Sequence, residues 1–217
     1  MTAESDERPT ITQFTDPMCT WCWGSEPVIR HLRVAYGNQI RIEYVMGGLI
    51  EDFDDFYDAA NDISEPSEVG PHWLEASKAH GMPVDTAIFD EDPAQSTYPA
   101  SVAYVAARQQ DETLASRYLR RLREAYATQV RNVNHREEQV EIAASVGLDV
   151  DEFTAALDDG TARAEFEADL SRTRATGVRA FPTYEIDGPE GPRLPAWCQT
   201  LHPQAGALAP EDTRLDP

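Results

Sequence analysis

Two short segments near the N-terminus have the residue pattern of β-strands. Residues 10–15 are β-branched or aromatic at most positions, and residues 39–46 alternate apolar with polar side chains. Between these segments, apolar residues recur at helical spacing from Val28 to Tyr36, and Gly37 ends the pattern. The order strand, helix, strand predicts a βαβ unit in which the second strand returns beside the first.

The region after this unit has the composition of helices. Four stretches are rich in Ala, Leu, Arg and Glu, and they carry Gly, Asn or Asp near their ends: residues 96–108, 114–127, 135–146 and 161–176. We therefore expect helices to dominate residues 49–176.

Several residues in this region have the positions of helix caps. Asn134 with Glu137, and Asp149 with Glu152, have the spacing of N-terminal caps, and Gly147 is placed for a C-terminal cap. These signals concern the architecture and predict no chemistry.

The candidate chemistry lies between the first strand and the first helix, where two residues separate Cys19 from Cys22. Two thiols at this spacing suit disulfide exchange, because the second sulfur lies about one turn deeper in the helix. Unpaired N–H groups at the helix start carry a partial positive charge that favours the Cys19 thiolate. We therefore predict that Cys19 attacks a substrate disulfide and that Cys22 resolves the mixed disulfide, with no metal or nucleotide cofactor.

A metal site is the alternative use of these two cysteines. Together with Cys198 and His202 they offer the ligands of a Cys3His zinc site. Structural zinc sites usually repeat their cysteine spacing between short loops, whereas this pair lies in a strand-to-helix turn flanked by Trp21 and Trp23. The sequence therefore favours redox chemistry, and we expect no bound metal.

A second segment, residues 177–186, joins a helix end to a β-rich run and contains the pattern Gly-Val-x-x-x-Pro-Thr. A C-x-x-C motif after the first strand, a long helical stretch and this pattern together resemble the DsbA family of thioredoxin-fold oxidoreductases. Residues 16–24 are similar to the signature of one branch, which contains FrnE-like proteins and predicted protein-disulfide isomerases. The resemblance implies an α/β, thioredoxin-like domain formed by residues 1–48 and 177–217, with a mostly helical insertion at residues 49–176.

The resemblance also implies roles for individual residues. Pro182 would follow a cis peptide bond and lie against the cysteines, so that the backbone at Phe181 can pair with a bound substrate strand. Trp21 and Trp23 are candidates for shaping the substrate groove, and we expect at least one of them to pack in the core. Thr20 belongs to the dipeptide that tunes the redox potential in the family. The implied substrates are thiols or disulfides of proteins or small molecules.

Charged and aromatic residues complete the candidate site. Asp16 lies three residues before Cys19, and a carboxylate held there would raise the pKa of this thiol and oppose the helix dipole. Arg179 is the nearest plausible cation in the proline segment. Residues 51–70 are acidic and aromatic, which indicates a solvated loop or a short helix near the active-site cleft.

The charge pattern restricts the partners and the host. The formal net charge is -21, and the basic residues are 17 Arg with a single Lys, Lys78. Such a surface disfavours nucleic acid and anionic membranes as partners. It favours a salt-loving, haloarchaeal host, because concentrated salt screens the repulsion between carboxylates. Residues 1–9 lack the basic and apolar regions of a secretory signal, and no apolar run is long enough to span a membrane, so we expect a cytoplasmic protein.

The C-terminal part departs from the family pattern. Prolines at positions 189, 192, 195, 203 and 210 leave little room for a closing helix, although residues 193–197 have the pattern of a last strand. Cys198 is either incidental or a third thiol.

Two other functions remain open from the sequence. Kappa-class glutathione transferases and hydroxychromene carboxylate isomerases share the resemblance, but they typically have Ser at the position of Cys19. Other relatives are adaptors in regulated proteolysis, which use the fold as a binding module without catalysis.

Overall fold

The computed structural model describes residues 8–187. Within them, three strands form one sheet in the order β2-β1-β3, with β1 at Thr10–Thr15, β2 at Arg41–Met46 and β3 at Thr183–Asp187. β1 pairs in parallel with β2, as the βαβ unit predicts, and antiparallel with β3. The strand expected at residues 193–197, Cys198 and the proline-rich C-terminal segment lie outside the described residues.

The helices confirm that the region between β2 and β3 is mostly helical. Nine α-helices lie within residues 8–187: α1 Thr20–Gly24, α2 Glu26–Tyr36, α3 Val69–His80, α4 Ile88–Glu91, α5 Tyr98–Gln110, α6 Glu112–Thr128, α7 Arg136–Val146, α8 Val150–Asp158 and α9 Thr161–Ala175. The four expected helices correspond to α5, α6, α7 and α9. Short 3-10 turns occur at Gly37–Gln39, Phe53–Asp55 and Pro66–Glu68.

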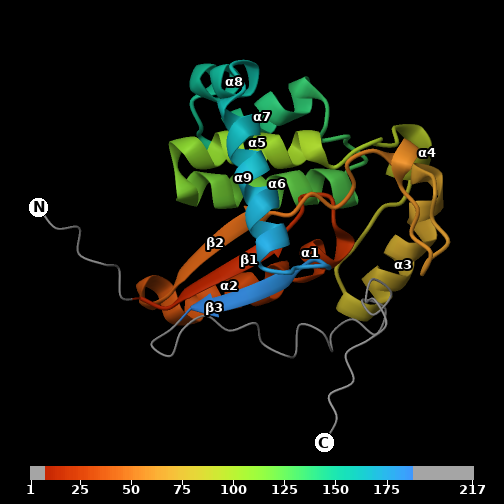
Figure 1. The fold of residues 1–217 in the computed structure, drawn as a ribbon, viewed down its shortest axis with the longest axis horizontal. Coiled ribbons are helices and arrows are strands. Elements are labelled where there is room, and N and C mark those ends of the chain that lie inside the picture. The colour runs from red at the N-terminus through yellow and green to blue at the C-terminus, as the bar shows by residue number, and fades with distance from the viewer. Residues whose placement is uncertain (1–7, 188–217) are drawn as a thin grey trace, which may run out of the picture.

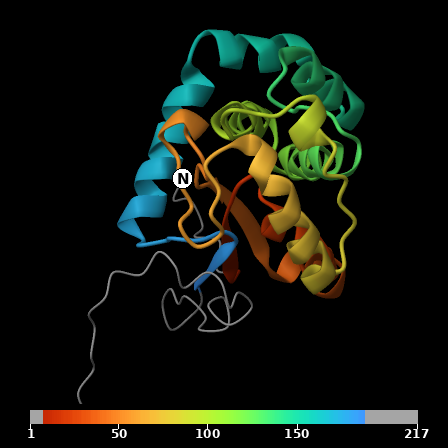
Figure 2. The ribbon, with the colours of Figure 1, turned by 90° about the vertical axis from the view of Figure 1, so that its right-hand side faces the viewer.

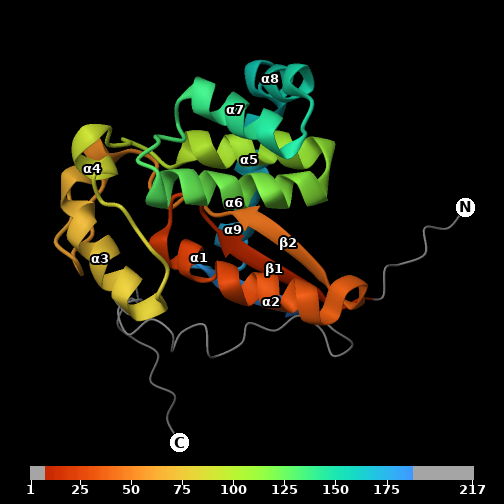
Figure 3. The same cartoon turned by 180° about the vertical axis from the view of Figure 1, so that it is seen from behind.

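The helices cover the sheet on both faces and at one end. α9 and α2 lie on opposite faces of the sheet, as the front and back views show (Figure 1, Figure 3). α5 to α8 stack beyond the end of the sheet, and α3 packs against α1 (Figure 2). One continuous hydrophobic core joins these layers, since Met46 of β2 and Tyr184 of β3 belong to the same buried cluster as Leu119 and Phe166 of the helices.

Two of the three expected helix caps are confirmed. Asp149 accepts the N–H of Glu152 at 3.0 Å, and Gly147 has the left-handed conformation of a C-terminal cap. The cap at Asn134 is wrong, because His135 is the residue that precedes α7. The Asn134 side chain instead bonds the Ala100 N–H and the Ser96 carbonyl, and it thereby holds the preceding loop against the start of α5.

A partly buried ion-pair network links α9 to the sheet and to α5. The Arg108 guanidinium contacts Asp169 at 2.9 Å and Glu165 at 2.8 Å, and it also donates to the Tyr44 carbonyl. Asp169 accepts the Met46 N–H at 2.9 Å. The last helix of the expected insertion is thus part of the layer that covers the sheet. Within residues 8–187, no helix has the length and apolar content that crossing a membrane requires.

Candidate active site

The two cysteines lie where the sequence predicts them, directly beyond the end of β1. Cys19 is the N-terminal cap of α1, and its sulfur accepts the Cys22 N–H at 3.4 Å. Both thiols are free. Cys19 is 5% exposed and lines a cavity, whereas Cys22 is 0% exposed and lies behind it. Cys19 is therefore the more accessible of the two sulfurs.

The segment before β3 lies opposite Cys19. The peptide bond between Phe181 and Pro182 is cis, which confirms what the resemblance implied. The Cys19 thiol donates to the Phe181 carbonyl, with 3.7 Å between sulfur and oxygen. Residues 162 positions apart in the chain thus meet at the reactive sulfur.

The cavity in front of Cys19 has a volume of about 200 Å³ and a largely apolar wall. Trp21 and Trp73 line it on the helical side, and Phe181 lines it on the side of the sheet. Phe56 and Ile63 come from residues 51–70, so the expected loop near the active-site cleft is confirmed. Arg179 also lines this cavity, and Asp58 and Asn61 supply further polar groups. An apolar side chain beside a substrate sulfur fits such a wall.

The two tryptophans have different environments. Trp21 lines the cavity, and its ring lies edge-on to His72 and His80. Trp23 is 3% exposed, and its indole N–H donates to the Pro83 carbonyl at 2.9 Å. The structure therefore places Trp23 in the core and not in the groove. Residues two apart in an α-helix point to opposite sides, which explains why only one of them faces the cavity.

Thr20 faces α3 through its hydroxyl group. Its oxygen lies 3.3 Å from His80 Nε2, while His80 Nδ1 accepts the Met82 N–H at 3.0 Å. Burial lowers the pKa of His80, so the neutral ring carries its proton on Nε2 and donates it to Thr20. Gly24 permits this approach, since a Cβ there would lie 2.5 Å from the His80 ring. The sequence carried no signal for His80, because it is 60 residues from Thr20.

Asp16 connects three segments around the site. It is fully buried, and its carboxylate accepts the N–H groups of Met18 at 2.8 Å and Leu49 at 2.9 Å and the Thr97 hydroxyl at 2.7 Å. Burial raises the pKa of Asp16, and these hydrogen bonds act against that rise. Its negative charge contributes to the raised pKa of Cys19, in the direction that the sequence predicts.

The two thiols differ in acidity. The hydrogen bond to Cys22 and burial raise the pKa of Cys19 well above its ordinary value, although the Cys22 N–H opposes the rise. Burial acts to raise the pKa of Cys22 as well, but its hydrogen bond with Cys19, the charge of Arg123 and the Thr15 hydroxyl lower it overall. The expectation for Cys19 considered only the start of the helix, and the Cys22 N–H there does act to lower the pKa of Cys19.

Replacing Asp16 by Asn is expected to lower the pKa of Cys19, because the substitution removes a buried negative charge near the sulfur. A pH titration of thiolate absorbance would measure the change. Asp85→Asn removes an exposed carboxylate and serves as the matched control. If the titration of Asp16→Asn is unchanged, Asp16 has only a structural role, in which it holds the loop at Leu49 against the turn at Met18.

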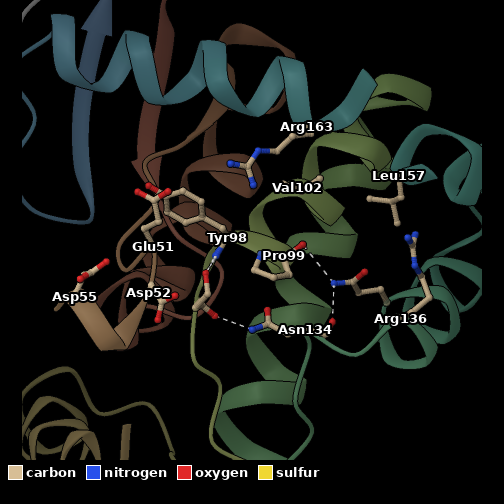
Figure 4. A pocket seen from close by; sticks show the side chains of 12 residues that line it. Glu51, Asp52, Asp55, Tyr98, Pro99, Val102, Asn134, Arg136, Leu157 and Arg163 are labelled. Carbon is tan, nitrogen blue, oxygen red and sulfur yellow. Dashed lines mark hydrogen bonds between the residues drawn. The ribbon is translucent and has the colours of Figure 1, made fainter. Parts of the chain in front are cut away.

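A larger cavity, of about 600 Å³, lies between the loop after β2 and the helices α5, α7, α8 and α9 (Figure 4). Glu51 lines it on one side, and Arg136 and Arg163 line it from α7 and α9. Arg136 pairs with Asp158 at 2.8 Å, and Arg163 pairs with Glu167 at 2.7 Å. None of the site residues expected from the sequence borders it. Of the two cavities, the smaller one is therefore the one that Cys19 faces.

Two of the four ligands of the zinc alternative, Cys19 and Cys22, lie in the part of the chain that the structure describes. No three or more His, Cys, Asp or Glu side chains gather there as metal ligands would. Cys198 and His202, the further ligands of the zinc alternative, lie outside the described residues.

Comparisons with known proteins agree with this geometry. A family model described as Thioredoxin matches residues 13–186. The ClpXP adapter protein SpxH of Halalkalibacterium halodurans is 31% identical over 174 residues, which cover 80% of this chain and 57% of that protein. The chain thus spans little more than half the length of the curated relatives that it matches.

Two solved structures have the same fold. A candidate protein disulfide isomerase of Nitrosomonas europaea superposes with a TM-score of 0.74 at 21% identity, covering 87% of this chain and 89% of that one. The cytosolic disulfide reductase DsbM of Pseudomonas aeruginosa gives a TM-score of 0.71 at 22% identity, covering 88% and 91%. These likenesses confirm the thioredoxin-like fold with a helical insertion.

Proposed function

Because the chain belongs to the thioredoxin family, we propose that it is a thiol-disulfide oxidoreductase that exchanges disulfides through Cys19 and Cys22. One observation carries this proposal. The accessible sulfur of Cys19 faces an apolar cavity and the Phe181 carbonyl, while the second sulfur lies directly behind it. This arrangement suits a nucleophile that meets the substrate and a partner that resolves the product.

The proposed reaction has two steps. In the first, Cys19 gives up its proton to water, and its thiolate attacks one sulfur of a substrate disulfide. A mixed disulfide forms, and the other substrate sulfur leaves as a thiolate that takes up a proton. In the second step, Cys22 gives up its proton to water and its thiolate attacks Cys19. The protein disulfide forms, the bond between Cys19 and the substrate breaks, and the substrate sulfur leaves as a thiolate that takes up a proton. Oxidation of a substrate dithiol runs the same steps in reverse.

The cavity suggests how a substrate strand is held. In the reduced protein the Phe181 carbonyl accepts a hydrogen bond from the Cys19 thiol, and that proton is lost when Cys19 becomes the thiolate. The carbonyl can then accept a backbone N–H of the substrate beside its sulfur. Trp21 and Phe56 would contact the neighbouring side chain of the substrate.

An adaptor function is the second candidate. The SpxH relatives are named ClpXP adapters, and a chain that acted in this way would deliver a protein to the ClpXP protease through a binding surface, without thiol chemistry. The glutathione-dependent transferase or isomerase activity is a third candidate, and the presence of Cys19 in place of Ser counts against it. For all three, we place the protein in the cytoplasm, with neither nucleic acid nor membrane as its partner.

A redox titration tests the main proposal. The fluorescence of the full chain, in which Trp21 lies beside the site, would be followed against dithiothreitol buffers in multimolar KCl. We expect a reversible two-electron transition that Cys22→Ser abolishes and Cys198→Ser preserves. Absence of the transition would contradict the proposed oxidoreductase function. Release of a metal on acidification would then support the alternative of a zinc site. Full adaptor-dependent degradation with Cys19→Ser would favour the adaptor.

We also propose that the protein works in concentrated salt, because of its net charge of -21 and its single lysine. The midpoint of thermal unfolding is expected to rise from dilute to multimolar KCl, where the Debye length falls to about 3 Å or less and repulsion between carboxylates is screened. Circular dichroism would measure the midpoint. A constant or falling midpoint would contradict the halophilic assignment.

A further inference from the structure

The larger cavity, with a volume of about 600 Å³, carries three carboxylates at one end. Glu51, Asp52 and Asp55 lie there, in the loop after β2, and Leu157 of α8 lies at the opposite end (Figure 4). Asp52 accepts the Asp54 N–H at 3.0 Å through one carboxylate oxygen. The carboxylates of Glu51 and Asp55 have neither an ion pair nor a hydrogen bond among the described residues. This end of the cavity therefore holds negative charge that the described part of the protein does not pair.

The two arginines of the cavity wall are already paired. Arg136 of α7 contacts Asp158 at 2.8 Å. Arg163 of α9 contacts Glu167 at 2.7 Å, and its guanidinium lies over the Tyr98 ring, 5.7 Å from the ring centre. Asp158 and Glu167 do not line the cavity, so each offsets an arginine from outside it. The wall thus keeps an excess of negative charge.

A buried acceptor lies in the same wall. Gln139 of α7 is 4% exposed, and its amide nitrogen donates to the carbonyls of Pro99, Val133 and Asn134 at 3.3, 3.0 and 3.5 Å. Its Oε1 accepts no hydrogen bond from the described residues, and it is not one of their enclosed atoms, so it opens to the cavity that Gln139 lines. Buried polar atoms are nearly always hydrogen-bonded. This oxygen is therefore placed to accept from a bound donor.

Backbone hydrogen bonds hold the acidic wall in place. The Thr97 N–H donates to the Ile50 carbonyl at 2.8 Å, and the Phe53 N–H donates to the Gln95 carbonyl at 2.9 Å. These bonds fasten the loop after β2 to the segment that precedes α5. The cavity is thus formed before a ligand binds, which lowers the entropic cost of binding.

The unpaired acceptors lie at two ends of the cavity, and this arrangement selects an elongated ligand. Gln139 is one turn beyond Arg136 on the same face of α7, and Arg136 lies across the cavity from Glu51 (Figure 4). Pro99 and Val102 form the wall between the two ends (Figure 4). A single metal ion cannot reach both ends, and no cluster of three metal-ligating side chains occurs in the described part of the chain. A linear chain with N–H donors at both ends can reach them.

We propose that this cavity binds a linear aliphatic diamine or polyamine. One ammonium group pairs with Glu51 and Asp55, and the alkyl chain crosses Val102. A second amine donates to Gln139 Oε1. The formal net charge of -21 favours the approach of such a cation. The site is separate from the proposed thiol chemistry, since Cys19 does not border this cavity.

Isothermal titration calorimetry of the full chain with spermidine tests the proposal, at the lowest KCl concentration at which circular dichroism shows the folded chain. We expect one spermidine to bind per chain. Butylamine has a single amine and should bind at least about tenfold more weakly, because it cannot reach both ends. Mg²⁺ at the same concentration should not displace spermidine. Absence of spermidine binding, equal affinity for butylamine, or displacement by Mg²⁺ would each overturn the proposal.

Two double variants with the same loss of charge distinguish a site from diffuse attraction. Glu51→Gln with Asp55→Asn removes the acidic end and should weaken spermidine binding at least about tenfold. Asp54→Asn with Asp90→Asn removes two exposed carboxylates that do not line the cavity. This control should bind spermidine within about twofold of the wild type, because exposed charges outside the site are screened by salt. Equal weakening by the two double variants would contradict a defined site.

Val102→Phe tests the cavity without a change of charge. The larger side chain fills the space between the two ends and should weaken spermidine binding at least about tenfold, because the alkyl chain then has no path. Circular dichroism would establish that the variant is folded. If it is not, Leu157→Trp fills the cavity from α8 instead. Wild-type affinity in a folded cavity-filling variant would overturn the proposal.

Discussion

Replacing Cys22 by Ser is expected to abolish turnover and to trap the protein as a mixed disulfide with its substrate. Cys19 remains at the cavity and can still attack, but the buried sulfur that would release the product is gone. The rate of repeated disulfide exchange should fall by several orders of magnitude, as it does when a covalent catalyst loses a reacting group. Non-reducing electrophoresis and mass spectrometry would detect the adduct on Cys19.

Two further variants make this experiment decisive. Cys19→Ser should form no adduct at the site, because the accessible nucleophile is missing. Cys198→Ser should turn over as the wild type does. Wild-type turnover by Cys22→Ser would show that one thiol suffices, and would exclude the two-step scheme. The adduct trapped by Cys22→Ser also identifies the substrate. An adaptor would bind its partner without a covalent bond, so Cys19→Ser would then recover that partner as efficiently as the wild type does.

Gly47→Ala is expected to disturb the substrate side of the site more than the fold. A Cβ at Gly47 would lie 2.0 Å from the Phe181 ring, so one of the two groups must move. The Gly47 N–H donates to the Thr15 carbonyl at 2.8 Å and continues the pairing of β1 with β2. Moving the glycine backbone would break this bond, so the Phe181 ring moves out of the cavity wall instead.

We expect the exchange rate of Gly47→Ala to fall about ten- to a hundredfold, as displacements near 1 Å at a reacting centre can cause. The unfolding free energy should fall by about 1–3 kcal/mol, which is typical of overpacking. Exchange kinetics with a peptide disulfide and chemical denaturation would measure these effects. Gly70→Ala is the matched control, because its Cβ would meet only ordinary contacts at 3.5 Å or more.

A double-mutant cycle identifies the cause. In a Phe181→Ala background the clash no longer exists, so Gly47→Ala should add little further loss of rate. Full additivity of the two substitutions would show that Gly47 acts through another contact.

Local patterns in the sequence were sufficient to predict the strands and the helix that lie next to Cys19 and Cys22. The β-branched and aromatic residues at 10–15 predicted β1, the alternation in residues 39–46 predicted β2, and the helical spacing up to Tyr36 predicted α2. Asp149 and Gly147 cap their helices because caps depend on neighbours within one turn. Asn134 failed as a cap because distant backbone groups of the α5 region compete for its amide.

The position of Cys19 and Cys22 at the start of a helix follows from residues adjacent in the chain, so the sequence by itself determined where the two thiols lie. The acidity of the pair required the fold, because Arg123 is 101 positions beyond Cys22 and only the packing of α6 against α1 brings it near. The same holds for His80 beside Thr20 and for the burial of Trp23. Spacing along the chain determines local conformation, whereas electrostatics and burial depend on which distant side chains the tertiary structure brings together.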